Sequence, residues 1–204
     1  QKLLKDQGIS YTVSKKHSDT IKSGKIISST PSTVGSHISK KNGTVSLIVS
    51  TGIEQITIPS DITNPQSSNG KNPLKALKKA GFTNIKHDSH TDKYSLSVPK
   101  GAVISISPQA GTKVNHNTAI TVVLSKGLKT VTMPDLVGIS RGDALAALAQ
   151  LKITANVKEE YSATADAGEV INQSVQADSK LKWNDTVTLT VSKGAHTITM
   201  PNVR

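Results

Sequence analysis

Alternation of polar and apolar residues marks the strands of this chain, and the same alternation recurs at intervals. The run Thr186–Ser192 reads Thr-Val-Thr-Leu-Thr-Val-Ser and is followed by Lys-Gly. Residues 119–125 repeat the alternation and the Ser-Lys-Gly ending, and residues 44–50 lead into a similar Ser-Thr-Gly. Strict alternation is typical of a strand with one buried and one hydrated face. We therefore predict three copies of one unit, each closed by such a strand.

Glycines and prolines at matching places define the period of the repeat. Gly52, Gly127 and Gly194 close successive copies at intervals of 75 and 67 residues, and prolines at positions 59, 134 and 201 keep these intervals. The middle copy is longer by two four-residue insertions that fall in connections, where structural repeats usually vary. We expect the first copy to be truncated and to begin inside its helix, because Leu4 aligns with Leu77 and Leu148. The predicted boundaries are 1–52, 53–127 and 128–194, with the start of a further unit at 195–204.

A helix is expected in each copy, because capping residues precede an apolar stripe. In the third copy Ser140 is a suitable N-cap with Asp143 three residues on, and leucines follow at positions 145, 148 and 151. One helix packed on one face of a three-stranded antiparallel sheet is the simplest arrangement that buries this pattern. We therefore predict an α+β fold of tandem small units in an elongated array, each unit with a short first strand before its proline.

Composition narrows the class of protein. Cysteine is absent, which excludes disulfide scaffolds and cysteine-based zinc sites. No apolar run approaches the roughly 20 residues of a membrane-spanning helix, so we expect no direct membrane insertion by this segment. The net charge of +11 comes almost wholly from lysine, and it favours either an anionic partner or a merely hydrated surface. We expect no nucleic acid partner, because arginine and aromatic residues are scarce.

No arrangement of residues typical of an enzyme stands out. The chain lacks both common kinds of Gly-rich phosphate loop, and nothing marks a serine, threonine or lysine as a nucleophile. We predict a non-catalytic segment with no cofactor. His87, His90 and Asp92 could ligate a metal by residue type, but they lie in an insertion that the other copies lack. We therefore expect no metal site.

The order of motifs in the second and third copies resembles the PASTA domain. The second copy carries Gly101-x-Val103-Ile104 and a closing Ser125-Lys126-Gly127. The third copy departs from the family pattern at Val175 and Asp178, where the pattern has Pro and Gly, which affects loop geometry rather than the fold. The motifs of the third copy are Pro134-Asp135-Leu136-Val137-Gly138, Gly168-x-Val170-Ile171-x-Gln173-Ser174 and Val187-x-Leu189-x-Val191-Ser192-Lys193-Gly194.

The resemblance implies a location and a ligand. PASTA domains occur in the extracellular part of membrane-anchored bacterial Ser/Thr kinases and at the C-terminus of some penicillin-binding proteins. Tandem arrays of three or more resemble the kinase ectodomain. The resemblance thus implies a region at the bacterial cell surface that binds peptidoglycan fragments or other anionic wall polymers weakly. It would regulate an attached kinase through a single membrane span, with a ligand-induced dimer of the parent. A structural spacer array and the tail of a penicillin-binding protein stay open as alternatives.

Three residues are candidate ligand contacts. Trp183 lies at the turn before the last strand, where an exposed indole suits stacking on a sugar or packing against the adjoining fourth unit. Arg141 follows the helix N-cap and suits a carboxylate of a stem peptide, or is simply hydrated. Tyr161 matches Tyr94 and His17 by position, and is either a ligand contact or a packing residue over the loop.

Overall fold

The computed structural model describes residues 2–33, 35–39, 42–197 and 200. Contacts divide the chain into two compact units, one of Gln1–Asp88 with Ser105–Val122 and the other of Ser89–Ile104 with Val123–Arg204. This division runs through the middle repeat, so the predicted repeat boundaries stay a prediction. The predicted start of a further unit at 195–204 lies largely outside the described residues. No helix among the described residues is long and apolar enough to cross a membrane.

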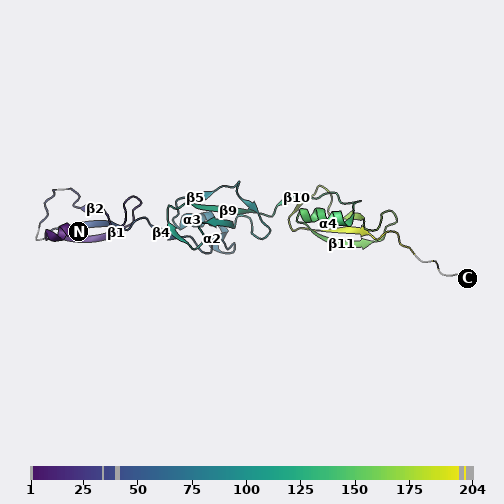
Figure 1. Cartoon of the computed structure of the whole chain (residues 1–204), viewed down its shortest axis with the longest axis horizontal. Coiled ribbons are helices and arrows are strands. Elements are labelled where there is room, and N and C mark those ends of the chain that lie inside the picture. The colour runs from purple at the N-terminus through teal and green to yellow at the C-terminus, as the bar shows by residue number, and fades with distance from the viewer. Residues whose placement is uncertain (1, 34, 40–41, 198–199, 201–204) are drawn as a thin grey trace. The chain divides into compact units, whose positions relative to one another are not determined.

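The predicted third repeat, residues 128–194, folds as a small sheet with a helix beside it (Figure 1). β14 is the central strand, with β11 on one edge and β12 on the other, while β10 and β13 form a separate antiparallel pair. β10 lies at the place of the predicted short first strand, and the α+β class is confirmed. The elements are β10 (Thr130–Thr132), α4 (Arg141–Gln150), β11 (Thr154–Glu160), β12 (Val170–Gln173), β13 (Lys180–Lys182) and β14 (Thr186–Ser192).

The prediction of an all-antiparallel sheet is wrong. β11 runs parallel to β14, with Thr154 paired to Thr186, whereas β12 is antiparallel to β14. The reason is strand order: β14 comes last in the chain but lies between the first two strands, so those two strands cannot form a hairpin. The first repeat has the same mixed arrangement in its three strands, β1 (Ser10–Lys16), β2 (Ile26–Thr30) and β3 (Thr44–Ser50).

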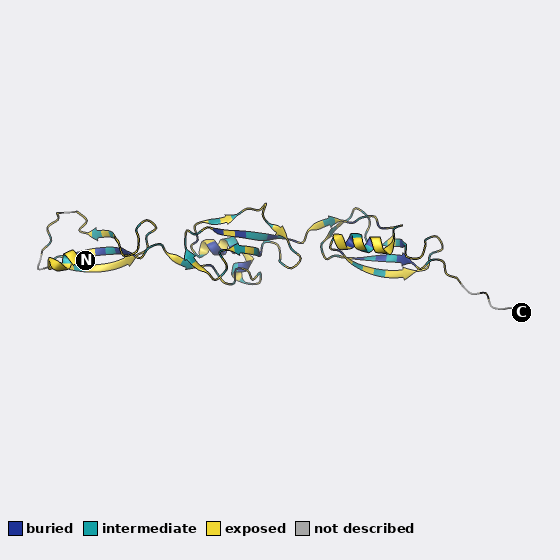
Figure 2. Cartoon of the chain, viewed as in Figure 1, coloured by how far each residue is buried: buried dark blue, intermediate teal, exposed yellow. Residues whose placement is uncertain are grey.

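The core of the third repeat lies between α4 and the sheet. Ala144 and Leu148 on α4 are fully buried, while the exposed side of the helix faces water (Figure 2). The hydroxyl of Ser140 accepts a hydrogen bond from the backbone N–H of Asp143, so the predicted N-cap is in place. The apolar residues of β14 are buried against the helix: Val187, Leu189 and Val191.

The remaining elements belong to the first and middle repeats. The middle repeat has the sheet order β5-β9-β6, with β7 paired to β9, and a second antiparallel pair, β4 with β8. These elements are α1 (Lys2–Asp6), β4 (Gln55–Thr57), α2 (Ser68–Lys71), α3 (Pro73–Lys79), β5 (Ile85–His87), β6 (Lys93–Tyr94), β7 (Val103–Ser107), β8 (Lys113–Asn115) and β9 (Ile120–Gly127).

The insertion before the middle helix forms the short helix α2. The hydroxyl of Ser67 accepts a hydrogen bond from the N–H of Gly70 and caps this helix. Asn69 donates to the carboxylate of Asp61 over 2.8 Å and ties α2 to the preceding turn. A Cβ at Gly70 would lie 1.8 Å from the carbonyl oxygen of Asn64, so only glycine fits there. The extra residues therefore form an ordered turn beside α3.

Candidate functional site

A buried serine joins the last strand of each repeat to the loop that precedes its second sheet strand. In the third repeat, the hydroxyl of Ser192 donates to the carbonyl of Ala165 over 2.9 Å and accepts from the N–H of Gly194 over 2.8 Å. Ser125 makes the same two bonds in the middle repeat, and Ser50 makes them in the first. Ser50, Ser125 and Ser192 are at most 3% exposed. We call this arrangement the serine lock.

The serine lock of the middle repeat fixes the position of the loop at 94–100. The N–H of Ser95 donates to the carbonyl of Gly127 over 3.0 Å, and Tyr94 on β6 pairs with Gly127 on β9. Gly127 has a φ of +76°, a left-handed conformation that suits glycine. Tyr94 and the loop after it are therefore held beside the end of β9 and the first residues of the next repeat.

An open groove of about 640 Å³ lies at this place, wholly within the second compact unit. Lys100, Lys126, Lys129 and Lys182 all line it, and none of the described lining residues is acidic. Such a concentration of one sign of charge attracts anions. The groove also carries large exposed apolar side chains, namely Tyr94, Leu96 and Leu128. The site can thus hold a small anionic ligand that has apolar parts.

Trp183 stands beside this groove and is half-buried rather than fully exposed. Its ring meets that of Tyr94 edge to face, with 6.1 Å between the centroids and 62° between the planes. The ammonium group of Lys152 lies 4.0 Å from the centroid of the indole. The backbone N–H of Trp183 donates to the carbonyl of Lys129 over 2.9 Å. Trp183 therefore packs against the preceding repeat and against its own.

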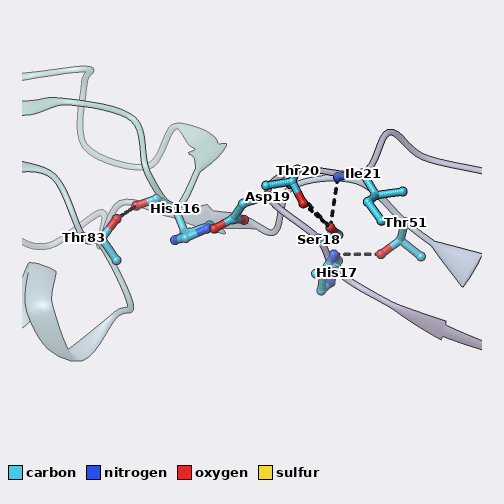
Figure 3. Close-up of polar contacts among 8 residues, drawn as sticks. All are labelled: His17, Ser18, Asp19, Thr20, Ile21, Thr51, Thr83 and His116. Atoms are coloured by element: carbon cyan, nitrogen blue, oxygen red, sulfur yellow. Dashed lines mark hydrogen bonds and ion pairs between the residues drawn. The ribbon is translucent and has the colours of Figure 1, made fainter. Parts of the chain in front are cut away.

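A second groove, of about 620 Å³, lies at the matching place in the first compact unit. Its chemistry is different, because its lining contains one lysine, Lys113. His116 takes the place of Trp183 here, and we call the two the tip residues. The Nε2 atom of His116 lies 2.9 Å from a carboxylate oxygen of Asp19 (Figure 3). Thr51 Oγ1 and His17 Nδ1 lie 2.8 Å apart in the same region. The lining residues are His17, Thr51, Ile53, Gln55, Lys113 and Asn115.

The structure separates the three predicted contact residues. Arg141 donates to the carboxylate of Glu159 over 3.2 Å, and its backbone N–H donates to the carbonyl of Gly168, so that N–H is not open to a ligand. Tyr161 is 57% exposed and meets the ring of His196 edge to face at 4.6 Å. None of the three is among the described residues that line the lysine-rich groove.

Sequence reasoning missed the groove lysines. They come from three segments of the chain: the end of the loop at 94–100, residues 126–129 and the end of β13. One signal was available, because the tyrosine of the loop and the lysine of the closing motif recur together as Tyr161 and Lys193. In the structure, the ammonium groups of Lys126 and Lys193 lie 5.8 and 5.2 Å from the ring centroids of Tyr94 and Tyr161.

Curated relatives resemble the chain along most of its length. It is 48% identical, over 98% of its residues, to the probable serine/threonine-protein kinase pknA2 of Bifidobacterium longum. It is 31% identical, over 72% of its residues, to the probable serine/threonine-protein kinase PknB of Corynebacterium glutamicum. The chain spans only 27% and 22% of the lengths of these two proteins.

Two solved structures from Staphylococcus aureus share the fold. The entire extra-cellular region of the Ser/Thr kinase PrkC matches with a TM-score of 0.65 and 26% identity, over 97% of this chain and 68% of that one. The three-PASTA-domain of a Ser/Thr kinase matches with a TM-score of 0.62 and 28% identity, over 95% of this chain and 92% of that one.

The family profile described as PASTA domain matches residues 72–126 and 131–193, which together make up more than half of the chain. These segments include α3 and α4 and the last strands β9 and β14. The segment is a non-catalytic one, as the sequence predicts, because the matched regions are PASTA domains. The chain belongs to the PASTA domain family.

Proposed function

We propose that the chain is the extracellular, wall-sensing region of a membrane-anchored Ser/Thr protein kinase, and that it binds peptidoglycan fragments weakly. Support for a kinase parent comes from relatives of that description, which match 98% and 72% of this chain. The structural neighbour described as an extra-cellular region supports a location outside the cell. A single membrane span would join this region to the kinase.

The observation that carries the ligand part of the proposal is the lysine-rich groove. Four ammonium groups line an open surface without a carboxylate among its described lining residues, so anionic fragments are favoured. Peptidoglycan stem peptides end in carboxylates and carry aliphatic side chains. Leu96 and Leu128, which are 53% and 39% exposed, offer apolar surface to such groups.

Weak binding follows from the same geometry. Lysine side chains on an open surface are hydrated and mobile, and an exposed ion pair contributes about 0.2–1 kcal/mol. A few such contacts give affinities far below those of a deep pocket. A signal would therefore depend on several sites acting together, through tandem repeats or a ligand-induced dimer of the parent.

A titration of the full chain with a disaccharide-peptide muropeptide tests the ligand. We expect saturable binding, measured by NMR or calorimetry, that weakens as ionic strength rises. The double variant Lys126→Gln with Lys182→Gln should weaken binding roughly two- to thirtyfold, since it removes two exposed ion pairs. Lys158→Gln is the matched control, because Lys158 is an exposed lysine on β11 that does not line the groove.

Equal affinity in the double variant and the control would remove the groove from the proposal. In that case Arg141 and Tyr161, which stay predicted contacts, become the next positions to change. Absence of binding at millimolar muropeptide would reject direct recognition and leave the spacer role. Loss of kinase signalling when the repeats are replaced by unrelated rigid repeats would instead argue against a spacer.

A further inference from the structure

The two walls of the lysine-rich groove come from different repeats. One wall is the loop at 94–100 with Lys126, which close the middle repeat. The other wall is the start of the third repeat at 128–130, together with Lys182. Tyr94 belongs to the first wall, and Trp183 directly follows Lys182 of the second. The contact between these two rings therefore links one wall to the other, and we call it the latch.

The third repeat holds its half of the latch rigidly. The carbonyl of Lys152 accepts the N–H of Asn184 over 2.7 Å, and the N–H of Thr154 donates to the carbonyl of Asp185. Lys152 and Asn184 both have positive φ, +55° and +68°, which are uncommon values for residues other than glycine. Trp183 is thus fixed on the turn before β14. The approach of this turn to Tyr94 depends on the contact between the two rings.

Charge opposes that approach. Closing the latch brings Lys182 and Lys129 of one wall toward Lys100 and Lys126 of the other, and like charges repel. The ammonium group of Lys152 over the indole adds a further positive charge at the latch. An anion that spans the groove neutralises both walls at once. It therefore favours the closed latch, and by linkage the closed latch favours the anion.

We propose that the latch is coupled to the ligand site, so that a wall fragment carrying two or more carboxylates closes it and stiffens the junction of the middle and third repeats. Tyr94 and Trp183 are positioning residues in this account, because they act through the arrangement of the lysines. This proposal rests on the proposed function, because it takes the muropeptide as ligand. It adds the physical event by which binding would be transmitted along the chain.

Trp183 is the sole tryptophan of the chain, so intrinsic tryptophan fluorescence comes from a latch residue. The full chain is titrated with a muropeptide that has free stem carboxylates, and emission and binding heat are followed in parallel. We expect the emission of Trp183 to shift and saturate at the same concentrations as the heat. A fragment with amidated stem carboxylates should bind at least tenfold more weakly and leave the emission unchanged.

Variants of Tyr94 test the positioning role of its ring without changing the charge of the groove. Tyr94→Ala removes the ring without changing any charge, and we expect a severalfold loss of affinity and an emission that no longer responds to the fragment. Tyr94→Phe keeps the ring and should restore both. Because Tyr94 is 47% exposed and lies outside the buried core, circular dichroism should show an intact fold in both variants. Lys158→Gln again serves as the control for charge.

The outcomes distinguish the two proposals. No binding heat in the unchanged chain rejects the proposed function and the latch with it. Binding heat with unchanged Trp183 emission, and equal affinity in Tyr94→Ala, rejects the latch while the proposed function stands. An equal response to the amidated fragment rejects the carboxylates as the groups recognised.

Discussion

The two grooves occupy matching positions in successive repeats, yet their chemistry differs. The serine lock is the same at both places, and the N–H of the tip residue bonds a matching carbonyl, that of Glu54 for His116 and of Lys129 for Trp183. The side chains above this backbone differ in charge and polarity. The matching pairs, with the residue of the first compact unit before that of the lysine-rich groove, are His17 and Tyr94, Thr51 and Lys126, Ile53 and Leu128, Gln55 and Thr130, and Asn115 and Lys182.

The difference shows which positions set structure and which set ligand chemistry. The hydroxyl of the buried serine and the left-handed glycine determine where the loop lies, so they recur in all three repeats. The residues that face the groove carry no such constraint. A change of two of them, Thr51 to Lys126 and Asn115 to Lys182, adds two positive charges between one junction and the next. Repeats of one chain can therefore share a backbone architecture and still present different binding surfaces.

The largest expected loss of stability comes from removing the serine lock, which the repeats share. Ser192→Ala and Ser125→Ala each leave a partly buried carbonyl and a glycine N–H without their partner, which costs about 1–3 kcal/mol. Urea unfolding of each variant should show this loss. Ser105→Ala, an exposed serine on β7, is the control and should stay within about 0.5 kcal/mol. Equal stability of Ser192→Ala and the unchanged protein would show that the lock contributes nothing.

A smaller loss of stability should distinguish Gly52 from Gly127, the glycines that close the first and the middle repeat. Both Gly52 and Gly127 have positive φ, so alanine costs about 1–2 kcal/mol at either place. A Cβ at Gly127 would also lie 3.1 Å from Cβ of Lys100, against 3.5 Å from Cβ of Ser23 at Gly52. Gly127→Ala should therefore lower the free energy of unfolding more than Gly52→Ala does. The reverse order would contradict the tighter packing of the second junction.

Exchanging one residue should place the carboxylate of the first compact unit in the lysine-rich groove. Leu96 occupies the place of Asp19, two residues after the ring of the loop in each case. Leu96→Asp introduces a carboxylate among the groove lysines and should weaken muropeptide binding roughly two- to fivefold. The binding is measured by calorimetry, and Leu96→Asn controls for the loss of the leucine. An unchanged affinity in Leu96→Asp would argue that charge does not set the selectivity.

The smallest expected effect is a change of stability with pH that comes from Asp61, beside the insertion of the middle repeat. The hydrogen bond from Asn69 lowers the pKa of Asp61 below its ordinary value of 3.8. Because the folded pKa is the lower one, the stabilisation is complete above pH 3.8 and is lost as pH falls through the folded pKa. Asp61→Asn should thus unfold at a slightly lower temperature than the unchanged chain at pH 7. The difference should vanish once the pH lies below the folded pKa, and a difference that persists in acid would exclude this carboxylate as its source.

Much of the fold could be predicted because local signals agree. The alternation in Thr186–Ser192 and the Ser140 cap depend on neighbours in the sequence, and both elements form where expected. Strand direction could not be predicted in the same way. The insertion of β14 between β11 and β12 is a long-range event that no local pattern records. The alternation is the same for parallel and antiparallel neighbours, so an antiparallel sheet was only the simpler choice.

The candidate site was harder to predict, for the same reason. The sequence predicts Trp183 at a turn, and the structure places it there, with its ring against that of Tyr94 of the preceding repeat. That contact joins residues 89 positions apart. The groove lysines converge only after three segments have folded together. Sequence reasoning therefore found a conspicuous side chain and missed the surface beside it.

One titration compares both grooves most directly. Backbone amide shifts of the full chain are followed as a muropeptide with free stem carboxylates is added. The account predicts the largest shifts at Gly127, Leu128 and Lys129, with the matching residues at 52–54 nearly unchanged. Equal shifts in both grooves, or shifts confined to residues 52–54, would contradict the claim that the lysines of the second junction select the ligand.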